Sequence, residues 1–311
     1  MAFSDPPELP EFIENQFPFR RRSYRLESGS YAGKALHFVD EGNESARPVL
    51  LLHGNPTWSF LWRKVIAKLD GFRCIAPDLM GLGFSDRIAR IEDHSLANHT
   101  EAVVELVVAL DLDRIVLVVQ DWGGPIGACV AAKLRERFDG VVIGNTAILI
   151  PERLKGTAFH RFSRVPILSD LVFRGLGFPQ NILHRVQGDR QSIRGEVARA
   201  YREPLRRWRD RVAPLALARM VPDHPEHPSV IALREGEAWL VGFEGPMSLV
   251  WGMNDPILGR ALKRHERTLT NAHVIRTQAG HFLQEEVPDV LADEIRRVAS
   301  ESEGRPIESL V

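Results

Sequence analysis

The sequence predicts an α/β fold in which helices flank a mainly parallel sheet and a helical insertion interrupts the core. Short apolar segments typical of strands alternate with helix-like segments in the first half and again near the end. This rhythm indicates parallel strands that are covered on both faces. Between the two stretches, strong strand signals are absent, and arginines and helix formers are frequent. We therefore expect residues 1–150 to form the first part of the core, residues 151–230 a helical cap, and residues 231–311 the second part.

The individual elements follow from local composition. Each expected strand is a short, mostly apolar run, and the strands are residues 35–39, 48–52, 72–76, 115–120, 141–145, 246–251 and 272–277. The expected helices are residues 60–69, 96–110, 125–138, 257–269 and 288–300. The second of these is amphipathic, as expected for a helix that packs on a sheet. The third begins with Pro125, which a first helical turn tolerates, and continues with small residues that suit close packing.

Composition limits the kinds of partner. The chain has 311 residues, of which 44% are hydrophobic and 26% charged, as in an ordinary soluble globular enzyme. Its 40 basic and 41 acidic residues give a net charge of -1, so we expect small-molecule partners and neither nucleic acid nor membrane lipid. Cys74 and Cys129 have no metal or redox spacing and are expected to be buried free thiols. Without a signal-peptide pattern or a long apolar run, we expect a cytoplasmic protein.

The most informative segment is a strand that runs directly into a glycine-rich turn. The apolar residues 115–120 are followed by Asp121, Trp122, Gly123 and Gly124, the pattern of the nucleophile elbow in the α/β-hydrolase fold. The glycines allow the backbone and the next helix to approach closely. An aspartate here attacks an sp³ carbon and forms an alkyl ester, so an alkyl halide or an epoxide is expected as substrate. In the alternative interpretation, Asp121 only caps the following helix.

A second turn lies at the same edge of the predicted sheet. Residues 53–56 (His-Gly-Asn-Pro) close an earlier strand and place Asn55 where ligands bind in open α/β folds. The backbone N–H groups of Asn55 and Trp122 could form an oxyanion hole. Their side chains carry an amide and an indole N–H, two neutral donors that suit a departing halide. An Asn-Pro turn without any chemistry is the alternative.

A histidine and a second aspartate complete the candidate site. His281 follows the last expected strand, and Asp255 follows the strand before it. This order of nucleophile, acid and histidine is that of α/β-hydrolases, in which the acid orients the histidine ring. The alternatives are a structural loop histidine and, for Asp255, a turn before Pro256.

Four stretches together resemble the haloalkane dehalogenases: Asp121-Trp122, residues 53–58 (His-Gly-Asn-Pro-Thr-Trp), residues 252–259 (Gly-Met-Asn-Asp-Pro-Ile-Leu-Gly) and residues 280–285 (Gly-His-Phe-Leu-Gln-Glu). In that family an aspartate displaces halide, a histidine activates water against the resulting ester, and an acid supports the histidine. The resemblance assigns these roles to Asp121, His281 and Asp255, with Trp122 and Asn55 as halide donors. It implies a primary alcohol and halide as products, without a metal or cofactor.

The branches of this family differ in two site residues. Some keep the acid after the preceding strand, where residues 145–149 (Asn-Thr-Ala-Ile-Leu) contain no carboxylate here, so Asp255 resembles the acid. Some draw the second halide donor from a cap tryptophan, and others from the asparagine of the His-Gly-Asn-Pro turn. The chain is similar to the latter, and Trp208 remains open as a donor. The cap aligns by position only, so its pocket-lining residues, the preferred substrate and the oligomeric state are not predicted.

Other functions occur on the same scaffold. Epoxide hydrolases share the aspartate elbow but use a pair of cap tyrosines, whereas Tyr24 and Tyr31 precede the core motifs and leave Tyr201 alone in the cap. Arginines after the nucleophile, expected in a fluoroacetate-type dehalogenase, are absent from residues 122–125. A binding protein or an oxygenase that does not dehalogenate stays open, because an inherited site need not retain its reaction.

Overall fold

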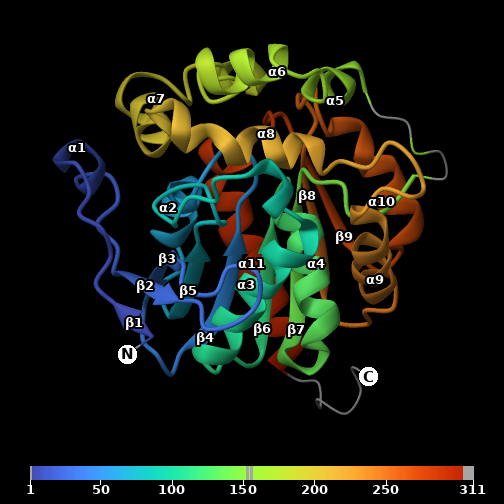
Figure 1. The fold of residues 1–311 in the computed structure, drawn as a ribbon. Helices are drawn as coiled ribbons and strands as arrows, with labels where there is room; N and C mark the ends of the chain where they lie inside the picture. The colour runs from blue at the N-terminus through green and yellow to red at the C-terminus, as the bar shows by residue number, and fades with distance from the viewer. Residues whose placement is uncertain (1, 152–153, 155–156, 304–311) are drawn as a thin grey trace.

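The computed structural model describes residues 2–151, 154 and 157–303, which form a nine-stranded sheet covered by helices (Figure 1). The strand order is β1-β2-β3-β5-β4-β6-β7-β8-β9. The strands are β1 (Phe3–Ser4), β2 (Arg21–Arg25), β3 (Ala35–Glu41), β4 (Arg47–Leu52), β5 (Phe72–Pro77), β6 (Ile115–Val119), β7 (Phe138–Gly144), β8 (Met247–Gly252) and β9 (His273–Thr277). Strands β4 to β9 pair in parallel, and β1, β2 and β3 add antiparallel pairs at one edge. The predicted mainly parallel sheet is confirmed.

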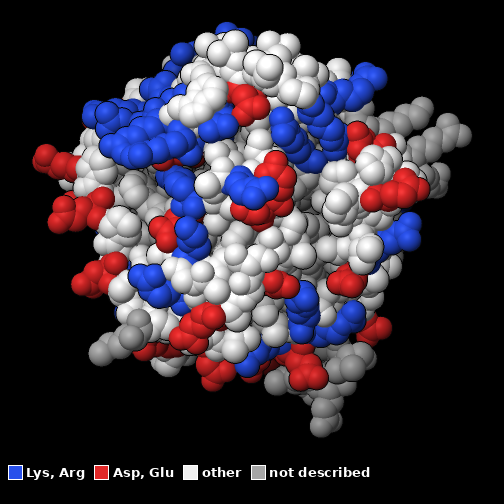
Figure 2. All heavy atoms as spheres, in the orientation of Figure 1, with Lys and Arg blue, Asp and Glu red and all other residues white. Residues whose placement is uncertain are grey.

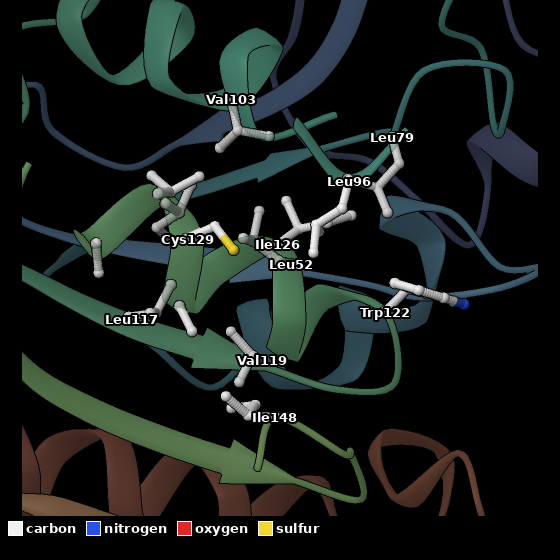
Figure 3. Packing of buried hydrophobic residues seen from close by; sticks show 14 of the residues in the cluster. Leu52, Leu79, Leu96, Val103, Leu117, Val119, Trp122, Ile126, Cys129 and Ile148 are labelled. Carbon is white, nitrogen blue, oxygen red and sulfur yellow. The ribbon is translucent and has the colours of Figure 1, made fainter. Parts of the chain in front are cut away.

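The centre of the sheet is buried on both faces. β6 lies between β4 and β7, and all of its residues are buried. Because successive side chains of a strand point to opposite faces, Val116 and Val118 join one hydrophobic cluster, whereas Leu117 and Val119 join the other. Figure 3 shows the second pair packed beside Ile126 and Cys129 of helix α4. A strand that is buried on both faces requires a continuous apolar run. This packing on both faces holds β6 in place at the start of the turn that follows it.

Helices cover both faces of the sheet. The core helices are α1 (Glu11–Glu14), α2 (Arg63–Ile66), α3 (Leu96–Ala109), α4 (Gly123–Lys133), α9 (Ser229–Val241), α10 (Leu262–Thr268) and α11 (Pro288–Glu303). Helices α3, α4 and α9 pack together and share one hydrophobic cluster. Helices α2 and α11 pack together and belong to the other cluster. This is the predicted two-sided arrangement.

The inserted segment lies across one end of the sheet (Figure 1). Its helices are α5 (Ala158–Ser163), α6 (Leu168–Asp170), α7 (Gly195–Arg202) and α8 (Val212–Arg219). Phe173, Leu215 and Ala218 form a small hydrophobic cluster within the cap. Lys and Arg side chains gather over the α7 side of this layer (Figure 2), and its exposed arginines include Arg190, Arg194, Arg199, Arg202, Arg206, Arg207 and Arg209. The expected boundaries between core and cap, at residues 150 and 230, stay predictions.

Several predicted helix limits are wrong. The helix expected at residues 60–69 is a 3₁₀ turn (Ser59–Trp62) followed by the short α2, because buried Asp78 accepts the backbone N–H of Ser59 and holds the turn. The helix expected at residues 125–138 begins at Gly123 and ends at Lys133, since Leu134 leaves the helical conformation. Phe138 instead starts β7. The helix expected at residues 257–269 begins with a 3₁₀ turn (Gly259–Ala261) before α10.

Candidate active site

Asp121 sits at a strained turn between β6 and α4. Its φ is 49°, in the left-handed region that side chains other than glycine rarely adopt. The turn is fixed by two contacts from the loop after β7: the Asp121 N–H donates to the Asn145 carbonyl at 2.9 Å, and the Thr146 hydroxyl donates to the Asp121 carbonyl at 2.6 Å. A Cβ on Gly123 would lie 2.0 Å from the Leu52 carbonyl oxygen. The predicted close backbone approach that requires glycine at position 123, after Asp121, is confirmed.

The Asp121 carboxylate is held on one side and open on the other. Its Oδ1 accepts the backbone N–H of Asn55 at 2.7 Å, so the turn after β4 binds the carboxylate directly. A Cβ on Gly54 would lie 2.2 Å from the same oxygen, and glycine is therefore required there. Oδ2 lies 3.6 Å from His281 Nε2. The Asp121 side chain is 17% exposed and that of His281 only 2%. Of these two groups, the aspartate is the more accessible to a small molecule.

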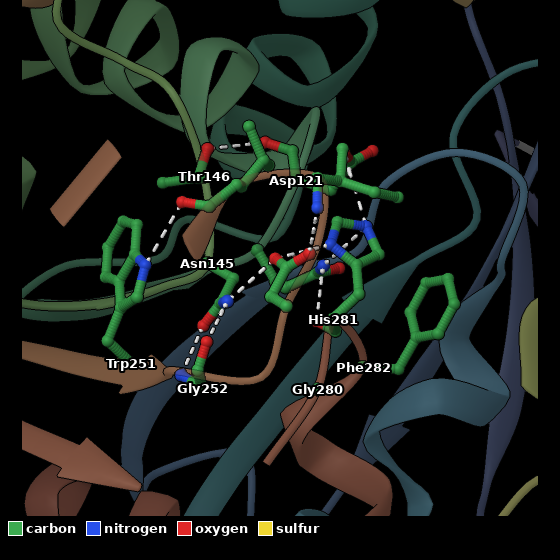
Figure 4. A network of polar contacts seen from close by, with 12 residues as sticks. Asp121, Asn145, Thr146, Trp251, Gly252, Gly280, His281 and Phe282 are labelled. Carbon is green, nitrogen blue, oxygen red and sulfur yellow. Dashed lines mark hydrogen bonds and ion pairs between the residues drawn. The ribbon is translucent and has the colours of Figure 1, made fainter. Parts of the chain in front are cut away.

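His281 and Asp255 form a buried hydrogen-bonded pair, in which Nδ1 of His281 lies 2.9 Å from Asp255 Oδ2. Figure 4 shows His281 in a polar network with Asp121 and Asn145. Burial acts to raise the pKa of Asp255, but the facing imidazole, the hydrogen bonds from His281 and Asn145, and the Ile257 N–H lower it below its ordinary value. Burial also acts to lower the pKa of His281, and the carboxylates of Asp255 and then Asp121 outweigh it, so that the pKa is raised. The pair is thus arranged to stabilise a protonated imidazole.

Three supporting residues were not predicted. Asn145, noted in the sequence only for lacking a carboxylate, donates its side-chain amide to Asp255 Oδ2 at 2.7 Å. Gln187 of the cap pairs with the backbone after the histidine: its Oε1 accepts the Phe282 N–H at 2.9 Å, and its Nε2 donates to the Phe282 carbonyl at 3.2 Å. Gln120 reaches His281 itself, with Nε2 3.1 Å from its carbonyl oxygen. In the sequence, only a position next to the end of an expected strand could have indicated such a role. Asn145 and Gln120 have such a position, and Gln187 does not.

The side chains of Asn55 and Trp122 have different surroundings. One N–H of the Asn55 side-chain amide donates to the Pro214 carbonyl of α8 at 3.0 Å, and the second N–H of the amide does not take part in that hydrogen bond. The indole N–H of Trp122 makes no hydrogen bond to another residue in the described part of the chain, and in Figure 3 it points away from the apolar cluster. Trp208, in contrast, is 46% exposed and lies beneath the Arg174 guanidinium on the cap surface.

The arrangement provides a carboxyl group with one oxygen held by a backbone donor, its other oxygen near an imidazole, and Nε2 of that imidazole not bound to Asp255. These are the parts of two-step nucleophilic catalysis with general-base assistance. Within residues 2–151, 154 and 157–303, no three His, Cys, Asp or Glu side chains are grouped so that they could hold a metal ion. The same residues contain no helix that is long and apolar enough to cross a membrane.

A family model, similar curated proteins and similar solved structures give consistent comparisons. A model of the alpha/beta hydrolase fold matches residues 47–288. The chain is 33% identical over 265 residues to a haloalkane dehalogenase of Mycolicibacterium paratuberculosis, covering 84% of this chain and 86% of the relative. It is 34% identical over 286 residues to haloalkane dehalogenase 2 of Mycobacterium tuberculosis, covering 89% and 93%. The solved haloalkane dehalogenase DpaA from Paraglaciecola agarilytica has a TM-score of 0.77 at 27% identity, covering 96% and 97%.

The raised pKa of His281 can be tested without any substrate. We expect a pKa above the ordinary 6.5 in the unaltered protein and a lower pKa in Asp255→Asn, because the substitution removes the nearer carboxylate and leaves burial. Titration of the ¹⁵N-labelled histidine ring by NMR measures both values. His265, whose pKa burial lowers to about 4, serves as an internal reference that should not move. Equal His281 pKa values in the two proteins would contradict the assignment of Asp255.

Proposed function

The chain belongs to the haloalkane dehalogenases within the alpha/beta hydrolase fold, and we propose that it hydrolyses the carbon–halogen bond of haloalkanes to an alcohol and a halide ion. A terminal halogen would give a primary alcohol. The observation that carries the proposal is the Asp121 carboxylate, held by the Asn55 N–H through one oxygen and facing His281 through the other. The two free, buried cysteines support the further proposal that the protein works in the reducing cytoplasm.

In the first step, Oδ2 of Asp121 attacks the carbon that bears the halogen. A carbon–oxygen bond forms as the carbon–halogen bond breaks, and the halide leaves with the bonding electrons. The Trp122 indole N–H and the Asn55 amide N–H that does not bind Pro214 would donate to the departing halide. Since α8 holds the Asn55 amide through Pro214, the cap helps to aim one of the two donors. Preorganised donors of this kind lower the barrier without reorganising during the reaction.

In the second step, His281 Nε2 takes a proton from water, and the water oxygen attacks the ester carbonyl of Asp121. Negative charge develops on Oδ1, which already accepts the Asn55 N–H at 2.7 Å. The Trp122 backbone N–H is the proposed second donor to this oxygen. Asp255 stabilises the protonated ring through Nδ1. Collapse of the intermediate releases the alcohol, which leaves with the proton from His281. The second proton of the water stays on the new carboxyl group and is then released to solvent, which regenerates the Asp121 carboxylate.

The structure offers little to an epoxide hydrolase. Tyr201, the cap tyrosine, is fully buried, and its hydroxyl donates to Glu285 at 2.5 Å. Tyr31 donates to the Asp93 carbonyl, away from Asp121. The discriminating assay offers bromo- and chloroalkanes and, in parallel, an epoxide. Matching halide and alcohol would support the proposal, diol without halide would support the epoxide hydrolase, and binding without any product would support a non-catalytic protein.

Replacing His281 should separate the two steps. In His281→Phe, Asp121 can still displace halide, but the base for ester hydrolysis is missing. We expect one stoichiometric release of halide and a peptide containing Asp121 whose mass has increased by the alkyl group. Intact-protein and peptide mass spectrometry measure the adduct, with Asp121→Asn as the control that should form none. Steady turnover by His281→Phe, or an adduct elsewhere, would contradict the order of the steps.

Replacing Trp122 tests the halide donors. Trp122→Phe keeps an aromatic ring and removes the indole N–H, so we expect carbon–halogen cleavage to slow about 10- to 100-fold, the effect of losing one hydrogen bond to a charged group. Rapid-quench measurement of halide release isolates this step. Trp208→Phe is the matched control and should leave the rate unchanged, because Trp208 lies on the outer surface of the cap. The reverse pattern would move the donor role to Trp208.

A further inference from the structure

We propose that Gln120 is a positioning residue that selects the working tautomer of His281 and keeps its Nε2 ready to accept a proton. The inference rests on the proposed two-step hydrolysis, in which His281 acts in the second step. Gln120 is the last residue before Asp121, its side chain is fully buried, and its backbone N–H donates to the Leu52 carbonyl at 3.2 Å. The end of β6 therefore fixes the glutamine and the nucleophile together.

The Gln120 amide faces two acceptors that belong to one residue. Its Nε2 lies 3.1 Å from the His281 carbonyl oxygen and 3.3 Å from His281 Nε2. An amide nitrogen carries two hydrogens and can serve both. Rotating the amide would instead bring its oxygen against the His281 carbonyl, which offers no proton. The nitrogen is thus oriented toward the histidine by its surroundings.

This contact reinforces the choice made by Asp255 on the other side of the ring. Asp255 accepts a hydrogen bond from the proton on Nδ1, so the neutral ring keeps that proton and carries its lone pair on Nε2. Gln120 donates to that lone pair. Each neighbour favours the same tautomer, the one in which Nε2 can accept a proton from water. At 3.3 Å the second contact is long, so a water can displace it when the base is needed.

Gln120 also opposes premature protonation of the base. The charged groups that face His281 are Asp255 and Asp121, and both favour the imidazolium form. A donor aimed at Nε2 favours the neutral form. The glutamine oxygen Oε1 is buried and has no partner among the described residues. Since an unpaired buried acceptor destabilises the fold, an apolar side chain would serve packing better, and the amide is explained by its contact with His281.

The test measures the two chemical steps separately as pH is varied. Gln120→Met keeps the length of the side chain and removes the donor, and Gln120→Glu replaces the donor with an acceptor. We expect halide release in a single turnover to stay near the unaltered rate in both variants. Hydrolysis of the Asp121 ester should slow. The acid limb of its pH–rate profile, below which the rate falls because His281 is protonated, should move upward by as much as about one pH unit in Gln120→Met. In Gln120→Glu it should move further. The limb rises because the neutral ring has lost its donor.

Gln284→Met is the matched control. Gln284 is also fully buried, lies three residues after His281, and has no hydrogen bond from its side-chain amide to any described residue. Its replacement should change stability without moving the acid limb. An unmoved limb in Gln120→Met, or an equal shift in Gln284→Met, would overturn the proposal.

A second readout does not depend on turnover. In the unaltered protein, the ¹⁵N shifts of His281 should show a protonated Nδ1 and a bare Nε2, and the His281 pKa should rise in Gln120→Met. A protonated Nε2 in the neutral ring would overturn the role of Gln120, even if the variants fail to fold. If no haloalkane is hydrolysed, the proposed function fails, and these NMR data still decide the tautomer.

Discussion

A buried carboxylate is tolerated only when donors satisfy its oxygens, and this requirement organises the whole site. Asp255 is satisfied by three donors from different places in the fold: His281 Nδ1, the Asn145 amide and the Ile257 N–H. Asn145 also accepts the Gly252 N–H, which joins the end of β7 to the end of β8. The same loop after β7 holds the backbone of Asp121. Asp121 and Asp255 are therefore fixed by one shared set of contacts.

The cap contributes to this geometry as well as covering it. The His281 N–H donates to the Val186 carbonyl of the cap at 2.8 Å, and Gln187 pairs with the next residue. Tyr201 of α7 donates to Glu285, which forms a buried ion pair with Arg63 of α2. The histidine loop is thus held between cap and core. On the opposite side, Asn55 donates to the cap through Pro214. Sequence changes in the cap can therefore alter the chemistry as well as substrate entry.

The sequence was sufficient to predict the positions that depend only on the order of strands and turns along the chain. Asp121, Asp255 and His281 each follow a strand, and parallel pairing brings such strand ends together. The supporting contacts depend on neighbours that chain order does not specify: Gln187 comes from a cap without strand rhythm, and the role of Asn145 requires β7 to lie beside β8. Strand β2, with three arginines among its five residues, was missed because it lacks an apolar run and is stabilised by its antiparallel partner β3.

In the proposed reaction, the oxygen of the alcohol comes from Asp121, and water replaces it in the carboxylate. A single turnover with enzyme in excess over a bromoalkane, run in ¹⁸O-labelled water, measures this directly. We expect label in the peptide that contains Asp121 and unlabelled oxygen in the alcohol. Label in the alcohol with none in that peptide would show that water attacks the carbon itself, and would contradict the ester intermediate on which the roles of His281, Asp255 and Gln120 depend.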